Sequence, residues 1–145
     1  TPRAALSPMY LLDTNVVSEL RKPKPHGGVV QWIEAAADAE LFISAVTIGE
    51  IQAGIEITRM QDKARAGELE RWLNEVSATF NVLAMDAAAF REWARLMHGT
   101  SDTPYEDAMI AATARVRELV VVTRNVRDFK KFGVEVLNPF SAGRR

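Results

Sequence analysis

The sequence contains no cysteine, and this absence removes several kinds of chemistry at once. Disulfide bonds, a catalytic thiolate and a zinc site with cysteine ligands are all excluded. Histidine is nearly as scarce, because His26 and His98 are the only two in the chain. Two imidazoles are too few for a metal site built mainly from histidine. A metal site in this protein would have to rely on oxygen ligands.

The chain also lacks a large excess of charge and any long apolar run. Its formal net charge is −1, so the overall balance does not predict a nucleic-acid partner. No apolar stretch approaches the roughly 20 residues of a membrane span, and no secretory signal precedes the first acidic residue. With 48% hydrophobic and 26% charged residues, the composition is that of an ordinary globular protein. We therefore expect a cytoplasmic protein with no membrane partner.

The length of 145 residues fits one domain. Residues 1–8 contain two prolines and an arginine before Met9, and we expect them to be a leader or an expression-derived tail outside the fold. Residues 141–145 are expected to form a C-terminal tail. The domain itself is predicted to span residues 9–140, without an internal repeat or an interdomain linker.

Strand-like and helix-like segments alternate along this domain. Short apolar runs typical of buried strands occur at 10–12, 41–44, 82–85, 119–123 and 134–136. Helical spacing of apolar residues occurs at 15–20, 29–37, 46–58, 64–76, 87–97 and 104–118. Pro104 fits the first turn of the last helix, with Thr103 or Asp102 as its cap. The alternation predicts a three-layer α/β/α domain around a central, mainly parallel sheet of about five strands.

Three acidic residues adjoin apolar runs, where an uncompensated charge would be costly. Asp13 follows the strand-like run 10–12, Glu50 lies within the helix-like segment 46–58, and Asp107 opens the apolar part of the segment 104–118. If folding brings these carboxylates together, their repulsion raises their pKa values unless a cation binds among them. Mg²⁺ and Mn²⁺ prefer such oxygen ligands. The pattern favours a metal-dependent enzyme of phosphoryl transfer.

Four sequence blocks resemble, in order, the signature blocks of the PIN-domain family: LLDTN at 11–15, SAVTIGE at 44–50, DAMIAAT at 107–113 and VTRNVRDF at 122–129. The similarity covers nearly all of residues 9–140 and looks closest to the VapC/FitB-type toxins of bacterial toxin–antitoxin pairs. It implies a Mg²⁺- or Mn²⁺-dependent endoribonuclease that a cognate antitoxin holds inactive. It also implies a homodimer, with DNA contacted only indirectly, through the antitoxin.

The resemblance places Asp13, Glu50 and Asp107 on the family's three acidic positions, as metal ligands and catalytic residues. A cation held by Asp13 and Asp107 would bridge to an RNA phosphate and lower the pKa of a water that attacks phosphorus. Asp107 is expected to stay ionised, because a helix N-terminus favours an anion by about 0.3–1 kcal/mol. Glu50 has a longer side chain and is expected to hold that water or accept its proton.

Four further residues complete the predicted site. The family's fourth position, often aspartate, is Asn125 here, and Asp128 follows three residues later. An amide neutralises a cation less than a carboxylate does, which favours one firmly bound ion over two. Thr14 and Thr123 are predicted to donate hydrogen bonds that fix the carboxylates.

Each of these polar residues also has an ordinary structural interpretation. Asp13 could cap a short helix, Asn125 could form the turn after its strand, and Asp128 could cap the residues that follow it. Asp107 could simply complement the helix dipole. Glu106 is its main rival as a ligand, but it lies about 100° around the helix and is interpreted as a rim residue. The four blocks together favour the metal site.

Positive charge gathers near the fourth block. Arg124 and Arg127 flank its asparagine, and we expect them to bind the phosphates of single-stranded RNA, with a solvated surface as the alternative. The three tryptophans lie on helical stripes, which favours core or interface positions over base stacking: Trp32, Trp72 and Trp93.

Two other functions compete with the ribonuclease. A phosphatase or phosphoacceptor module typically needs a second acid close to the first, and Asn15 offers an amide where that acid would be wanted. A catalytically inactive, metal-binding PIN domain could act only through a partner, but it would not need intact acids. The residues therefore favour the toxin ribonuclease, with the inactive domain as the alternative.

Overall fold

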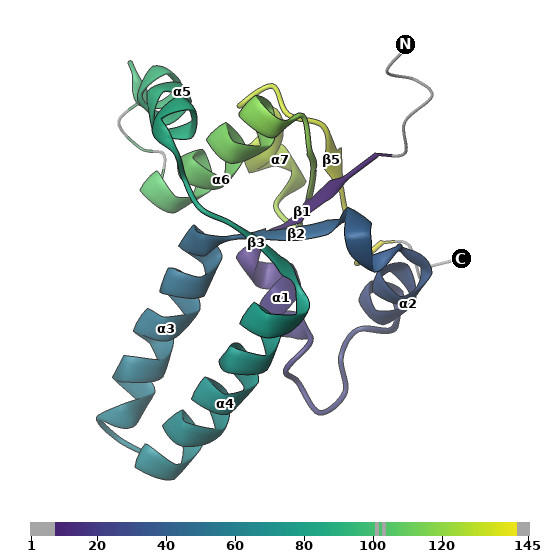
Figure 1. Cartoon of the computed structure of the whole chain (residues 1–145), viewed down its shortest axis with the longest axis vertical. Coiled ribbons are helices and arrows are strands. Elements are labelled where there is room, and N and C mark those ends of the chain that lie inside the picture. The colour runs from purple at the N-terminus through teal and green to yellow at the C-terminus, as the bar shows by residue number, and fades with distance from the viewer. Residues whose placement is uncertain (1–7, 101, 103, 142–145) are drawn as a thin grey trace.

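Five parallel strands make one sheet in the order β3-β2-β1-β4-β5 in the computed structural model (Figure 1). The structure describes residues 8–100, 102 and 104–141, so most of both predicted tails and the predicted cap Thr103 lie outside the described residues. The strands are β1 (Tyr10–Leu12), β2 (Leu41–Ser44), β3 (Asn81–Leu83), β4 (Val120–Val122) and β5 (Val136–Leu137). All four neighbouring pairs run parallel, as the alternating sequence pattern predicts.

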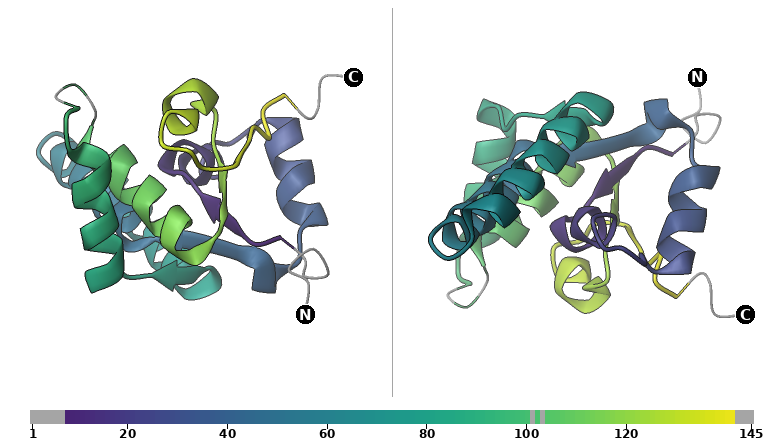
Figure 2. Two further views of the ribbon diagram at one scale, coloured as in Figure 1. Left: turned by 90° about the horizontal axis from the view of Figure 1, so that it is seen from above. Right: turned by 90° about the horizontal axis from the view of Figure 1, so that it is seen from below.

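Helices cover both faces of this sheet, which confirms the predicted three-layer architecture. They are α1 (Thr14–Glu19), α2 (Gly27–Ala35), α3 (Ala45–Arg59), α4 (Lys63–Thr79), α5 (Ala87–Met97), α6 (Tyr105–Arg117) and α7 (Val126–Lys130), with a 3₁₀ turn at Asp38–Glu40. In Figure 1, α5, α6 and α7 lie on one side of the sheet, while α1 and α2 lie on the other. Figure 2 shows α2 at the opposite end of the molecule from the pair α3 and α4. Among the described residues, no helix is both long and apolar enough to cross a membrane.

Successive strand residues point to opposite faces, and each face has its own core. Leu11 and Val121 pack with Ile110 and Phe129 under α6 and α7. Their neighbours Leu12 and Val122 instead join the buried cluster of α1 and α2 on the other face. Both faces are therefore dry, which explains why the central strands consist of continuous apolar runs instead of alternating ones.

Side chains cap the N-terminal ends of helices α3, α4 and α5. Ser44 accepts the Val46 N–H at 3.0 Å, Asp62 accepts the Arg65 N–H at 3.0 Å, and Asp86 accepts the Ala89 N–H at 2.9 Å. Such caps satisfy amide groups that have no partner inside the helix.

The start of α6 differs from the prediction. Pro104 is itself the residue before the first turn, and it makes no side-chain capping bond, so the expected cap by Asp102 is wrong. The Pro104 carbonyl accepts the Ala108 N–H at 3.2 Å and begins the helix from an extended backbone. Proline can take this position because it needs no hydrogen-bond partner for its own nitrogen.

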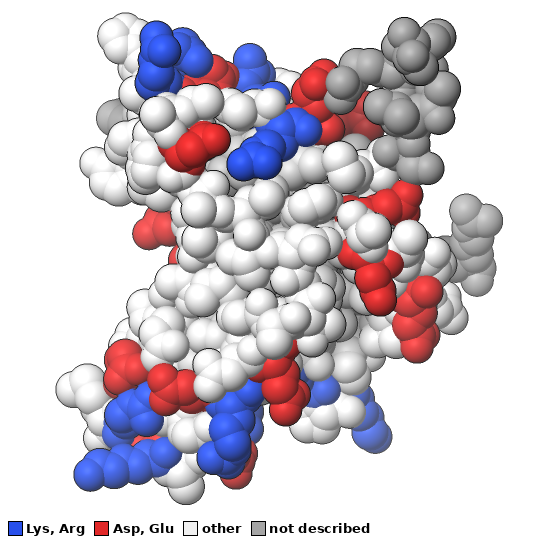
Figure 3. All heavy atoms as spheres, viewed as in Figure 1, with Lys and Arg blue, Asp and Glu red and all other residues white. Residues whose placement is uncertain are grey.

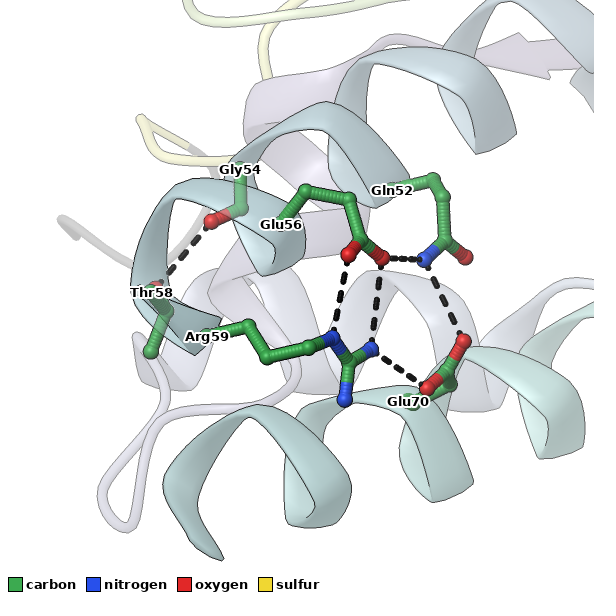
Figure 4. A network of polar contacts seen from close by, with 6 residues as sticks. All are labelled: Gln52, Gly54, Glu56, Thr58, Arg59 and Glu70. Carbon is green, nitrogen blue, oxygen red and sulfur yellow. Dashed lines mark hydrogen bonds and ion pairs between the residues drawn. The ribbon is translucent and has the colours of Figure 1, made fainter. Parts of the chain in front are cut away.

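Helices α3 and α4 form an antiparallel pair that projects from the sheet. A small apolar cluster of Ile55, Ala66 and Leu73 lies between them. A polar network beside it ties the two helices together (Figure 4): Arg59 contacts Glu70 at 2.6 Å and Glu56 at 3.0 Å. Charged side chains of both signs gather at this end of the molecule on the face drawn in Figure 3.

Candidate active site

The chain reverses its order of strand addition between β1 and β4. It passes from β1 to β2 and β3 on one side and then returns to add β4 on the other side of β1. Asp13 follows β1 directly. Its N–H donates to the Val122 carbonyl at 2.9 Å, which extends the hydrogen bonding between β1 and β4 by one residue. Thr123 follows β4 at the same level. Asp13 and Thr123 thus lie at the carboxyl edge of the switch point, where open α/β sheets bind their ligands.

The Asp13 carboxylate is 3% exposed and is held by donors on both oxygens. Oδ1 accepts the Thr14 N–H at 2.8 Å and so caps α1, while Oδ2 accepts the Thr123 hydroxyl at 2.8 Å. The amide of Asn15 donates to Oδ2 as well, at 3.2 Å. Burial raises the pKa of Asp13, and the hydrogen bonds from Thr123 and Thr14 oppose that rise. Capping and a site at the sheet edge are therefore compatible uses of one side chain.

Glu50 approaches the same edge from α3. Its Oε1 accepts the Thr14 hydroxyl at 2.7 Å, and the Thr14 oxygen also lies 3.0 Å from the Thr47 hydroxyl. Partial burial raises the pKa of Glu50, the Thr14 hydrogen bond lowers it, and the charges of Asp13 and Glu106 raise it further. Thr14 therefore touches both Asp13 and Glu50, although Glu50 lies 36 positions further along the chain.

Asp107 lies half-buried in the first turn of α6. Burial raises its pKa to about 6, with repulsion from Asp13, Glu50, Asp128 and Glu106 adding to the effect. Desolvation and like charges therefore outweigh the helix N-terminus, which by itself would favour the ionised form. Asp107 is still mainly ionised at neutral pH, but its ionised form is less favoured than the helix N-terminus alone would make it.

The structure thus brings Asp13, Glu50 and Asp107 into one electrostatic environment at the sheet edge, with Asp128 close enough to act on Asp107. Among residues 8–100, 102 and 104–141, no group of three His, Asp or Glu side chains forms a complete metal-binding cluster. Repulsion between carboxylates opposes their closer approach. The donor set nevertheless fits a hard divalent cation, because it consists of carboxylate oxygen atoms whose negative charges repel one another.

The segment after β4 contributes mainly through Thr123, which is fully buried. Its hydroxyl donates to Asp13 and accepts the Asn125 N–H at 2.9 Å and the Asn15 amide at 3.2 Å. The Asn125 side chain is exposed at the start of α7 and makes no capping bond there. In the sequence, Asn15 stands out only as an amide at a position where a phosphatase would need a second acid. Its side-chain amide can donate hydrogen bonds through its nitrogen and accept one through its oxygen.

The two arginines of this segment differ in their surroundings. The Arg124 guanidinium carbon lies 3.8 Å from the centroid of the Phe140 ring. Arg127 is exposed, and within the described part of the chain it forms no hydrogen bond or ion pair through its side chain. The predicted phosphate contact therefore suits Arg127 better than Arg124.

A sequence model of the PIN domain family matches residues 10–135 of the chain. The protein belongs to the PIN domain family. The match spans β1 to the residue before β5, so it includes every residue of the candidate site. It confirms the family resemblance carried by the four sequence blocks.

Relatives of this PIN domain protein cover nearly its whole length. It is 35% identical to the plasmid stability protein StbB of Pseudomonas syringae pv. tomato, over 92% of this chain and 100% of StbB. It is 34% identical to the VapC ribonuclease Y4jK of Sinorhizobium fredii, over 91% of this chain and 98% of that protein. The crystal structure of FitAcB from Neisseria gonorrhoeae matches with a TM-score of 0.80 at 30% identity, over 91% of this chain and 99% of that chain.

Proposed function

We propose that this PIN domain protein is a divalent-metal-dependent endoribonuclease and the toxin of a bacterial toxin–antitoxin pair. The observation that carries the proposal is the joint placement of Asp13, Glu50 and Asp107 near the switch point of the sheet, where the charge of Asp13 raises the pKa values of both Glu50 and Asp107. The relation to a VapC ribonuclease at 34% identity supports RNA as the substrate class. Mg²⁺ or Mn²⁺ is the proposed cofactor because all the available ligands are oxygen atoms.

Asp13, Asp107 and Glu50 would hold the metal. When bound, the ion would polarise the phosphate and lower the pKa of its water ligand. Thr123 and Asn15 fix one oxygen of Asp13, and the Thr14 hydroxyl orients Glu50. Glu50, with a raised pKa, accepts a proton closer to neutral pH than an ordinary glutamate does.

The remaining residues around the site bind the substrate, orient groups beside the metal or add negative charge. Arg127 binds phosphate of single-stranded RNA from the exposed side of α7, and Asn125 orients water or a carboxylate beside the site. Asp128 adds negative charge near Asp107 and supports the hold on the cation. A cognate antitoxin inhibits the enzyme, which works as a cytoplasmic homodimer and reaches DNA only through that antitoxin.

The direct test is RNA cleavage by purified, antitoxin-free protein. Cleavage is expected with Mg²⁺ or Mn²⁺ and should stop with EDTA, because the carboxylates alone repel the phosphate. Sequencing of the RNA ends should show internal cuts at defined positions, and single-stranded DNA of the same sequence serves as the control substrate. Intact RNA after prolonged incubation with Mn²⁺ would refute the proposal.

Removal of the Thr123 hydroxyl should weaken the site without unfolding the protein. Thr123→Val takes a donor from Asp13 and an acceptor from the Asn125 N–H. We expect Mn²⁺ affinity, measured by calorimetry, to fall by about 10- to 100-fold, as is usual when a group that orients a metal ligand is lost. Thr113→Val is the matched control, because this buried hydroxyl donates only to the Met109 carbonyl in its own helix. Equal affinities of the two variants would contradict the assigned role.

Neutralising Asp107 should stabilise the metal-free protein at neutral pH. The raised pKa, about 6 against 3.8, means that the folded state binds the proton more tightly, so stability falls as pH rises from about 4 to 6. Asp107→Asn removes this penalty, which we put at roughly 1 kcal/mol after discounting for solvent screening, or about 3 °C in Tm. Thermal unfolding at pH 7.5 should show the gain and at pH 4 should not. A gain of the same size at both pH values would argue against the proposed origin.

A further inference from the structure

We propose that Arg124 is a positioning residue of the candidate active site. It anchors the turn 123–125 to the C-terminal segment through Phe140, and thereby holds Asp13 in place, instead of binding RNA phosphate. The inference rests on the proposed nuclease function. It gives a role to the C-terminal residues that follow β5, which no motif of the sequence singled out.

Phe140 is the anchor of this arrangement. It is 4% exposed and belongs to the core cluster on the α1 and α2 face. Its N–H donates to the Asn138 side chain at 2.9 Å, which closes the turn after β5. The Arg124 guanidinium carbon lies 3.8 Å from the ring centroid, and the His26 ring lies 5.3 Å away at a tilt of 59°. A guanidinium this close to an aromatic face is attracted by the ring's negative face.

A buried carboxylate strengthens the hold on Arg124. Glu19 is 6% exposed, and its oxygens accept the His26 N–H at 2.9 Å and contact the Lys22 ammonium at 2.9 Å. The Lys22 hydrogen bond is the main cause that lowers the pKa of Glu19, and the charge of Arg124 contributes to the same effect. The arginine therefore already has an aromatic partner and a nearby negative charge. Reaching a phosphate would mean leaving the Phe140 ring.

The backbone of Arg124 connects this anchor to the site. Its N–H donates to the side-chain oxygen Oδ1 of Asn15 at 3.3 Å. The amide of Asn15 donates in turn to Asp13 and to the Thr123 hydroxyl, both at 3.2 Å. Thr123 and Asn15 are the side chains that hold Asp13 Oδ2. A shift of residue 124 is thus passed to the carboxylate through two hydrogen bonds, and small misplacements of a ligand are costly to catalysis.

Steady-state RNA cleavage at several salt concentrations separates a positioning residue from a phosphate ligand. For Arg124→Ala we expect kcat to fall about 10-fold, with KM for RNA and its salt dependence unchanged within about twofold. For the matched variant Arg127→Ala we expect the opposite: KM rises and the salt slope falls by about 1, as for a lost phosphate contact. If Arg124→Ala behaves like Arg127→Ala, the proposal is wrong.

Two further variants test the anchor itself. Phe140→Leu keeps an apolar side chain but removes the aromatic face, and it should reproduce the loss of kcat without adding to it in the double variant. Arg124→Lys should recover part of kcat, because an ammonium also binds an aromatic face. A wild-type kcat for Phe140→Leu, or additive losses in the double variant, would overturn the proposal.

Denaturant unfolding provides a readout that does not depend on cleavage. A double-mutant cycle of Arg124→Ala and Phe140→Leu should give a coupling of about 2- to 5-fold in the unfolding equilibrium constant. No coupling would overturn the inference even if the enzyme is active. Failure of the wild-type protein to cut any RNA would instead refute the proposed function, and the coupling would remain as a purely structural result.

Discussion

Asp13→Asn should reduce the rate of RNA cleavage by about three orders of magnitude while the protein stays folded. The amide keeps the shape of the side chain and an oxygen that can accept the Thr14 N–H, so the cap of α1 survives. It removes the negative charge from the most buried carboxylate of the site, and with it the strongest electrostatic reason for a cation to bind. Metal stabilisation of transition-state charge amounts to several kcal/mol, and each 1.36 kcal/mol corresponds to a factor of ten.

Single-turnover cleavage with Mn²⁺ measures this effect, and circular dichroism checks the fold. Glu106→Gln is the matched control: it also removes one negative charge that acts on Glu50 and Asp107, but from an exposed rim position. We expect that variant to stay within about threefold of the wild-type rate. A wild-type rate for Asp13→Asn, or equal losses in both variants, would show that the chemistry takes place elsewhere.

Phe129→Ala should destabilise the protein by about 3–5 kcal/mol, which is the usual cost of removing a fully buried aromatic side chain. Phe129 is completely buried, packs with Leu11 and Val121 of the central strands, and lies edge-on to Phe132 at 6.3 Å between ring centroids. Phe129 is the only buried residue of the short helix α7. Loss of the Phe129 ring would also weaken the packing of the N-terminal end of α7, where Asn125 lies.

Urea unfolding would measure the loss, and the Tm should fall by about 10–15 °C. Phe90→Ala provides the comparison, because Phe90 on α5 is 47% exposed and should cost no more than about 1 kcal/mol. Similar losses for the two variants would mean that burial of Phe129 does not hold α7 against the sheet.

The central strands were the most predictable part of the fold. Residues 10–12 and 41–44 form strands with the predicted bounds, and 120–122 lies within the predicted 119–123. Their apolar runs reflect burial on both faces, which is a local property of the sequence. The edge strands differ more from their predicted bounds. The strand predicted at 82–85 is Asn81–Leu83, and the strand predicted at 134–136 is Val136–Leu137. Edge strands have only one paired side, so turns and neighbours decide where pairing starts and stops.

Helix α7 shows the limit of pattern reasoning. The sequence pointed only to a turn at Asn125 and a possible cap at Asp128, whereas residues 126–130 form a helix. Five residues are too few to show a helical period, and isolated helices of this length are unstable in water. Burial of Phe129 against the sheet supplies the missing free energy.

The acids of the candidate site were recognisable before the fold, because their neighbours form blocks that resemble a family. The pKa values of these acids could not be predicted from the sequence. The pKa of Asp107 rises to about 6 through burial and through charges on α3, α7 and the end of β1, all distant in sequence. The contact of Thr14 with Glu50 spans 36 positions and that of Thr123 with Asp13 spans 110, so no local pattern could show either.

Sequence alone determined the class of fold, the parallel strands, the family and the acidic residues to watch, because apolar period and residue type are local. Only the tertiary structure decided which donors hold each carboxylate, how strongly the acids repel one another, and that Arg124 lies against Phe140. Those properties depend on distances between chain segments, and the sheet order β3-β2-β1-β4-β5 sets these distances by placing the end of β1 beside the end of β4.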